Sequence, residues 1–212
     1  MTKIYDIHGN VHTIIQDNPN LATLSEQFKT IKYEFDLISG NVNKVIYQDG
    51  DVDRFYHKYF YDADNRISEV YTSRDNIIWE RDAKYFYYRH GPLARAEVGD
   101  LIVQGVDYAY TIHGWLKGVN AGALNATRDM GGDGQGSNYR KNIGIDAFGF
   151  ILDYYEGDYT QINSGTNSFI PAVGTSGFSD VTANLFNGNI RAMTTASRAP
   201  SSRYSYGNRT CE

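Results

Sequence analysis

The amino-acid sequence predicts an all-β protein built from consecutive antiparallel β-hairpins. One unit recurs along the chain: two aromatic positions separated by one residue, a polar turn, and a returning apolar strand. The equivalent residues Phe35, Tyr61, Tyr87 and Tyr110 are separated by 26, 26 and 23 positions, and a period in the twenties is typical of stacked repeats. The 212 residues include 18 Tyr and 21 Gly but only 4 Pro, which favours half-exposed strands joined by glycine turns.

The clearest copy of the unit spans residues 59–67. Tyr59 and Tyr61 are two positions apart, so both rings lie on the same face of a strand. The next four residues are rich in Asp and Asn, whose side chains bond the nearby backbone and tolerate left-handed dihedrals. In the returning strand, Ile67 and Val70 are out of step by one residue. We therefore expect a β-bulge there.

Other copies keep the aromatic positions and the turn, with Tyr88 and Thr111 in place of the turn aspartate in two of them. Degenerate copies occur at 186–190 and 204–209. We assign a structural role to the residues that define the unit. They are Tyr5, Asp6 and Gly9; Tyr33, Asp36 and Gly40; Tyr59, Tyr61, Asp62 and Arg66; Tyr85, Tyr87 and Gly91; and Tyr108, Tyr110 and Gly114.

Taken in order, the chain begins with a predicted hairpin at 1–17. Residues 21–27 follow as a brief helical turn or a loop over a sheet edge. Runs of strand-forming residues between turn signals then predict strands within 28–52 and at 54–61, 67–72, 77–88, 93–98 and 101–103.

The predicted organisation has four parts. A hairpin strip covers 1–116, and a Gly-rich insertion loop covers 117–142. Residues 143–196 continue the repeat region around a Ser/Thr/Gly loop at 163–184, and 197–212 is a degenerate repeat or a disordered tail. We expect these parts to form one elongated β unit. Because the sequence starts and stops inside repeats, we expect a fragment of a longer protein, a degenerate gene or a designed boundary.

Composition excludes several classes of protein. The net charge of −5 argues against nucleic acid as a partner, which usually needs a basic stripe. Cys211 is the only cysteine, so no internal disulfide can form. The first residues lack the apolar run of a signal peptide, and no run is long enough for a membrane helix. We expect no membrane insertion.

Two acidic segments were weighed as cation sites. Asp49, Asp51 and Asp53 have calcium-loop spacing, but Arg54 and Phe60 stand where that loop needs Gly and Glu. We therefore expect a plain turn. The second segment has carboxylates without a motif, so we expect a solvated loop; its candidate ligands are Asp129, Asp133, Ser137 and Asn138. Gly132, Gly134 and Gly136 do not make a phosphate loop, because the Lys-Ser/Thr ending is absent.

No residues stand out as a catalytic set. His8, His90 and His113 each precede a turn glycine, and stacked repeats would hold them apart rather than let them converge. No carboxylate pair is marked as an acid/base couple. The repeated tyrosines are interpreted as a cross-strand ladder rather than as a platform for sugar rings. We therefore expect no enzyme and no cofactor.

The pattern Tyr-x-Tyr-Asp-x-x-Gly/Asn-Arg/Asn-Leu/Ile/Val resembles the YD repeat of RHS-repeat proteins, a family that includes bacterial Rhs, toxin-complex shell proteins and animal teneurins. Segments 79–97, 103–108 and 146–150 look most like large secreted RHS-repeat proteins of Bacteroidetes. The resemblance covers nearly the whole chain. It implies a curved, spiralling sheet that is part of an RHS-type shell, and a secreted or cell-surface location.

Toxin-releasing members of that family carry an Asp-Pro-x-Gly-Leu-type motif for self-cleavage, but this chain has no Asp-Pro pair, so self-cleavage is not expected. We expect a non-enzymatic structural segment of a β-shell that encapsulates cargo such as a toxin, or of an adhesive scaffold. Its partner would be the rest of a longer shell or another copy of the chain. The alternative is a carbohydrate- or protein-binding module that uses the tyrosine face and the 129–138 loop.

Overall fold

The computed structural model describes residues 1–24, 26–124, 127–136, 139–161, 168–169 and 184–198. These residues form twelve β-strands and two short 3-10 helices. The predicted all-β fold of consecutive antiparallel hairpins is therefore confirmed. The twelve strands belong to one sheet in chain order, and the chain divides into two compact units, Met1–Gly105 and Val106–Glu212. The boundary lies before the predicted end of the hairpin strip at residue 116.

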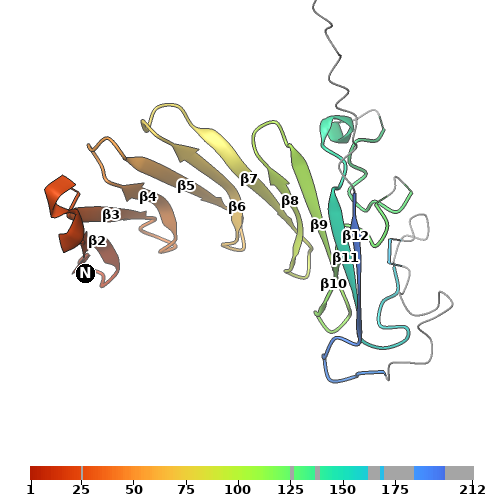
Figure 1. The fold of residues 1–212 in the computed structure, drawn as a ribbon. Helices are drawn as coiled ribbons and strands as arrows, with labels where there is room; N and C mark the ends of the chain where they lie inside the picture. Colours follow the sequence, from red (N-terminus) through yellow and green to blue (C-terminus); the bar gives the residue numbers. More distant parts are fainter. Residues whose placement is uncertain (25, 125–126, 137–138, 162–167, 170–183, 199–212) are drawn as a thin grey trace, which may run out of the picture. The chain divides into compact units, whose positions relative to one another are not determined.

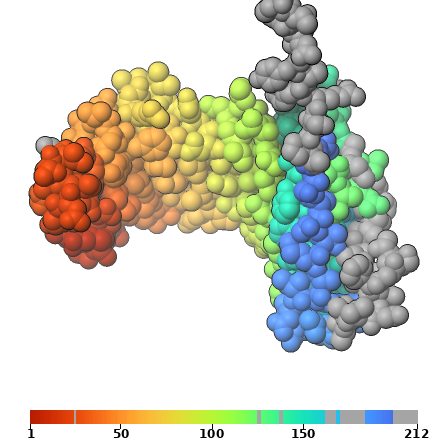
Figure 2. Space-filling view, in the orientation of Figure 1, coloured from red at the N-terminus to blue at the C-terminus, as the bar shows by residue number. Residues whose placement is uncertain are grey.

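Unit 1 is a single sheet in which each strand is antiparallel to its chain neighbours (Figure 1). Figure 2 shows its hairpins side by side in chain order. The 3-10 helix η1 (Pro19–Leu24) confirms the helical turn expected after the first hairpin. The strands are β1 (Thr2–Tyr5), β2 (Val11–Asp17), β3 (Phe28–Phe35), β4 (Val42–Tyr47), β5 (Phe55–Tyr61), β6 (Ile67–Ser73), β7 (Glu80–Tyr87) and β8 (Leu93–Val98).

The hairpins of unit 1 share a register shift next to the turn. In the β5–β6 hairpin, Phe60 lies opposite Glu69 but Tyr61 lies opposite Ile67, so Ser68 is the extra residue. The same shift occurs in the β1–β2, β3–β4 and β7–β8 hairpins. The predicted bulge is confirmed, and it belongs to the repeat unit rather than to one hairpin.

The two faces of this sheet differ in chemistry. The ladder places Tyr59 opposite Val70 and Val70 opposite Ala83, which makes one face aromatic and aliphatic. The other face carries Lys58 and other charged side chains. Because no α-helix or second sheet covers either face within the described part of unit 1, few of its apolar side chains are fully buried. These are Ile46, Tyr56, Ala83 and Ala96.

Unit 2 contains β9 (Gln104–Tyr110), β10 (Leu116–Val119), β11 (Phe148–Asp153) and β12 (Ala192–Ser197), each antiparallel to the next. The 3-10 helix η2 (Tyr139–Asn142) lies between β10 and β11. Ala109, Ile151 and Phe169 form a small buried core, against which Met130 and Tyr159 pack.

The described part of the Gly-rich insertion packs onto the sheet of unit 2, although we expected an open, solvated loop. A Cβ at Gly149 would lie 2.3 Å from the carbonyl oxygen of Ala121, and one at Gly122 would lie 2.1 Å from Ile151 Cδ1. Glycine is required here because backbone lies directly against its neighbours. The insertion also contributes Met130 to the core, so it is part of the fold of this unit.

The structure leaves some expectations untested. Most of the loop predicted at 163–184 and residues 199–212 of the predicted tail lie outside the described residues, and so do Ser137, Asn138 and Cys211. Among the residues that are described, no helix is long and apolar enough to cross a membrane.

Candidate functional site

The turn aspartate of the repeat holds its own turn together. Asp62 Oδ1 accepts hydrogen bonds from the backbone N–H groups of Asp64 and Arg66, both at 2.9 Å. Its Oδ2 pairs with the guanidinium of Arg66, 2.7 Å away. The side chain of Arg66, with these backbone donors, keeps the pKa of Asp62 below its ordinary 3.8. Asp62 is therefore an ionised, hydrogen-bonded turn residue and not a proton donor for catalysis.

Asp6 and Asp36 do the same in earlier copies. Asp6 Oδ1 accepts the N–H groups of His8 and Asn10 at 2.8 Å each. Asp36 Oδ1 accepts from Ser39 N at 2.7 Å, and its bonds to the Ser39 backbone and hydroxyl lower its pKa. The repeat has five such turns, which begin at Asp6, Asp36, Asp62, Tyr88 and Thr111. Each contains one residue with left-handed backbone dihedrals, which favour glycine or asparagine. These residues are Gly9, Gly40, Asn65, Gly91 and Gly114.

The turn survives where the aspartate is replaced. Thr111 N donates to Trp115 O at 2.8 Å and Gly114 N donates to Thr111 O at 2.9 Å, matching the backbone bonds around Asp62. The Thr111 hydroxyl accepts the N–H of Trp115 at 3.2 Å, as the carboxylate does elsewhere. The Tyr88 turn keeps the two backbone bonds as well.

The second tyrosine of the unit links one hairpin to the preceding one. Tyr61 donates its hydroxyl to Val42 O, and Tyr87 donates to Ile67 O, each at 2.7 Å. Each acceptor is the first residue of the strand that returns from the preceding turn. We call these contacts the tyrosine links. Through them, Tyr61 and Tyr87 each bond the hairpin that precedes their own.

Unit 2 contains a third link that the sequence pattern did not reveal. Tyr154 donates its hydroxyl to Leu116 O at 2.8 Å, and Leu116 is again the first residue of the returning strand. The insertion between β10 and β11 removes the constant spacing, so periodicity could not find Tyr154. The alternation of Phe148, Phe150 and Leu152 towards Tyr154 was the available signal.

The first tyrosine of the unit behaves differently. Tyr33, Tyr59 and Tyr85 are 26 positions apart, lie on the same face of unit 1 and are half-buried. Within the described part of the chain their hydroxyls make no hydrogen bond. Burial raises the pKa of Tyr59 above 10.0, and the nearby phenols of Tyr61, Tyr33 and Tyr85 contribute. The three hydroxyls form a row of hydrogen-bonding groups, here called the tyrosine row.

The tyrosine row belongs to a larger aromatic face. Phe55 and His57 have ring centroids 5.0 Å apart, and His57 stacks on Tyr59 at 6.3 Å. Strand pairing gives the members of this face, which we call the aromatic face: Tyr33, Phe35, Tyr47, Phe55, His57, Tyr59, Tyr61, Tyr85 and Tyr87.

The opposite face of unit 1 mixes charged side chains with aromatic rings, since Lys58 lies over the Phe60 ring and Lys84 over the Phe86 ring. Lys44 and Lys58 are cross-strand neighbours, and each ammonium lies 5.7 Å from the Trp79 ring. Lys84 pairs with Glu69 at 3.1 Å. Such exposed pairs stabilise little, but they keep this face compatible with water.

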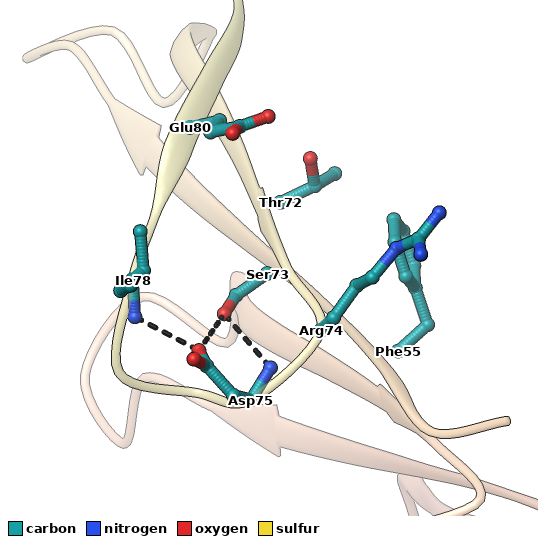
Figure 3. A pocket seen from close by; sticks show the side chains of 7 residues that line it. All are labelled: Phe55, Thr72, Ser73, Arg74, Asp75, Ile78 and Glu80. Atoms are coloured by element: carbon teal, nitrogen blue, oxygen red, sulfur yellow. Dashed lines mark hydrogen bonds between the residues drawn. The ribbon is translucent and has the colours of Figure 1, made fainter. Parts of the chain in front are cut away.

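A shallow hollow of about 470 Å³ opens where the aromatic face meets the β6–β7 turn (Figure 3). Phe55 and the exposed Arg74 lie on one side of it, and Thr72 and Glu80 on another. No ion pair engages Arg74 or Glu80 within the described residues. The hollow therefore offers a ring, a cation and a carboxylate to a ligand.

Two polar side chains of the hollow are engaged by its own turn. The Ser73 hydroxyl donates to Asp75 Oδ1 at 3.0 Å and accepts the N–H of Asn76 at 2.9 Å. Asp75 accepts the N–H groups of Ile77 and Ile78, and these bonds lower its pKa. Both side chains shape the turn, and the carboxylate beside the serine already accepts two backbone N–H groups. The arrangement suits binding.

The acidic and histidine residues do not converge. Asp49 accepts the Tyr56 hydroxyl at 3.0 Å, whereas Asp53 pairs with Lys29 at 2.7 Å. Asp129 accepts the N–H groups of Gly131 and Asp133 and so closes its own turn. No group of three or more metal-ligating side chains occurs in the described ranges.

The histidines face different neighbours. His90 stacks on Tyr88 at 5.2 Å, and His113 lies 3.2 Å from the Tyr155 hydroxyl. His8 is exposed at its turn. Each therefore belongs to its own hairpin.

Unit 2 holds a buried ionic cluster that no motif in the sequence predicts. Lys117 Nζ lies 2.7 Å from Asp153 Oδ1 and 2.8 Å from Asp158 Oδ1, with side-chain exposures of 1, 5 and 5%. Lys117 occupies the bulge of the β9–β10 pair, between residues opposite Tyr110 and Ala109. The repeat thus supplies the position, and the lysine is particular to this hairpin.

No protein-family model matches the chain, and no curated protein shows significant similarity to it.

Proposed function

We propose that the chain is a non-enzymatic structural segment of a secreted or cell-surface RHS-repeat protein, forming part of a β-shell around cargo or of an adhesive scaffold. The observation that supports this best is the use of the motif residues. The aspartates build the turns, and Tyr61 and Tyr87 tie each hairpin to the one before. A β-shell needs residues that hold each hairpin against the next one. The motif residues have this role here.

The two faces of unit 1 support the same proposal. The sheet is a single layer, and lysines such as Lys44 and Lys84 lie on the face opposite the aromatic face. These lysines suit contact with water, while the half-buried rings of the aromatic face favour contact with a partner or an enclosed chain.

The proposal is tested by two matched sets of variants. Tyr61→Phe with Tyr87→Phe removes tyrosine links, and Tyr59→Phe with Tyr85→Phe removes two hydroxyls of the tyrosine row. A scaffold predicts that the first set unfolds at lower urea concentration and that the second does not. Screening wild type against ester, peptide and glycoside substrates should show no turnover; turnover abolished by one side-chain change would refute the proposal.

A second function has its own support. The tyrosine row and the adjoining hollow at Phe55 and Arg74 present hydrogen-bonding groups beside aromatic surface, which suits carbohydrate or peptide binding. The 129–136 segment is a weaker candidate than expected, because Asp133 is fully buried. Titration with oligosaccharides, read by tyrosine fluorescence, should show binding that Tyr59→Phe with Tyr85→Phe weakens. The absence of binding across a glycan panel would count against this function.

A further inference from the structure

The cluster of Lys117, Asp153 and Asp158 is more elaborate than an ion pair requires. One ammonium lies between two carboxylates in a site that its side chains barely expose to water. Burying charged groups is costly, and here one ammonium and two carboxylates are buried together. We infer that Lys117 and Asp153 join covalently through a side-chain amide bond, with Asp158 carrying the protons.

The geometry brings the reacting groups together. Lys117 Nζ is 2.7 Å from Asp153 Oδ1, and a carboxyl carbon behind such an oxygen is at near-attack separation, about 3–3.5 Å from the nitrogen. Transfer of one proton along this hydrogen bond converts the ion pair into a neutral amine and a neutral acid. The reaction proceeds from this neutral pair, because the free amine is the nucleophile.

The second carboxylate is held for proton transfer. Asp158 Oδ1 lies 2.8 Å from the same nitrogen, and its Oδ2 accepts the backbone N–H of Tyr154 at 2.9 Å. A carboxylate fixed at both oxygens cannot turn away from the amine. Proton transfer by such a group is the usual role of a general base.

The reaction balances without any further reagent. Lys117 Nζ, as the free amine, attacks Cγ of protonated Asp153, and the new C–N bond forms. Asp158 takes one proton from this nitrogen and returns it to the departing hydroxyl. The C–OH bond breaks and one water molecule leaves, so the product is an amide and Asp158 is regenerated.

The bond would join β10 to β11, the two strands that flank the insertion. Lys117 is at the start of β10 and Asp153 ends β11, so segment 118–152 would lie within a covalent loop. Such a cross-link restricts the unfolded chain and keeps the two strands together under load. This inference is independent of the proposed scaffold function.

The test is the mass of the purified full chain after denaturation. We expect a mass lower than that of the sequence by one water molecule, and the full mass for Lys117→Arg, which keeps the charge but cannot form the amide. Asp158→Asn keeps both reacting groups and should slow bond formation by about 100-fold or more, the usual contribution of a general base.

Tryptic digestion distinguishes this amide bond from other reactions that release water. An amidated Lys117 is not cleaved, so peptide 96–128 should appear joined to peptide 142–191, and fragmentation should place the branch at Asp153. Unchanged mass in wild type would overturn the inference. A loss of water combined with normal cleavage after Lys117 would also overturn it, because a succinimide elsewhere in the chain gives that result. A branch at Asp158 would overturn the assignment of Asp153 as the acceptor.

Discussion

Removing one hydroxyl should show whether the tyrosine links hold the hairpins of unit 1 together. Tyr87→Phe deletes the oxygen that donates to Ile67 O at 2.7 Å and keeps the ring. The guanidinium of Arg66, 4.4 Å from the ring centroid, can still stack on it. Burial raises the pKa of Tyr87 above 10.0, so in the wild type the hydroxyl remains a donor across the neutral range.

The expected loss follows from the environment of the bond. A neutral hydrogen bond contributes about 0.5–1.5 kcal/mol net. Ile67 is only half-buried, so water can reach its carbonyl and the full penalty for an unpaired buried group does not apply. We therefore expect a loss of about 1 kcal/mol, or a Tm lower by about 4–8 °C for a unit of this size.

The assay needs a signal from unit 1 alone. The chain has two tryptophans, so a Trp115→Phe background leaves Trp79 as the reporter of urea unfolding. Tyr85→Phe is the matched control, because it removes a hydroxyl that has no hydrogen-bond partner in the described part of the chain, from the same strand. Equal losses of stability for Tyr87→Phe and Tyr85→Phe, or no loss of stability for either, would refute the reasoning.

Three further variants test other parts of the structure. Phe35→Tyr should supply the missing link, with Val11 O as acceptor, and raise the urea midpoint; a lower midpoint would count against the repeat geometry. Gly149→Ala should destabilise unit 2 by about 1–3 kcal/mol through overpacking, because its Cβ would meet Ala121 O, and unchanged thermal unfolding would contradict this. Because the folded pKa of Asp62 is depressed below 3.8, its stabilisation is present above pH 3.8 and is lost as pH falls through the folded pKa. The free energy of unfolding of Asp62→Asn should therefore change less with pH in this range than that of the wild type. Identical pH dependences of the two proteins would exclude the effect.

The hairpins were predictable because their signals are local. Two aromatic positions separated by one residue set the face, and Asp62 with its neighbours sets the turn. Even the bulge could be read from the misalignment of Ile67 and Val70. Each of these depends on residues within about ten positions, and the repetition of the unit reinforced a pattern that a single copy would have left ambiguous.

Contacts that cross the insertion were not predictable in the same way. The link from Tyr154 to Leu116 joins residues 38 positions apart, and the Lys117 cluster needs both β10 and the segment after β11. The sequence shows that Lys117 occurs in a repeat, but not that its bulge turns the side chain inward. Packing of Gly149 against Ala121 was equally hidden, since glycine-rich sequence suggests a loop until the facing backbone is known.

The repeat therefore sets positions, and the residues placed there decide what each hairpin does. At the second aromatic position, Tyr61 and Tyr87 use their hydroxyls for the link, whereas Phe35 has none to use. At the bulge, the β5–β6 hairpin has Ser68 and the β9–β10 hairpin has Lys117. A sheet built in this way can carry a different side chain in one hairpin without disturbing the others, because turn and link are made by different residues.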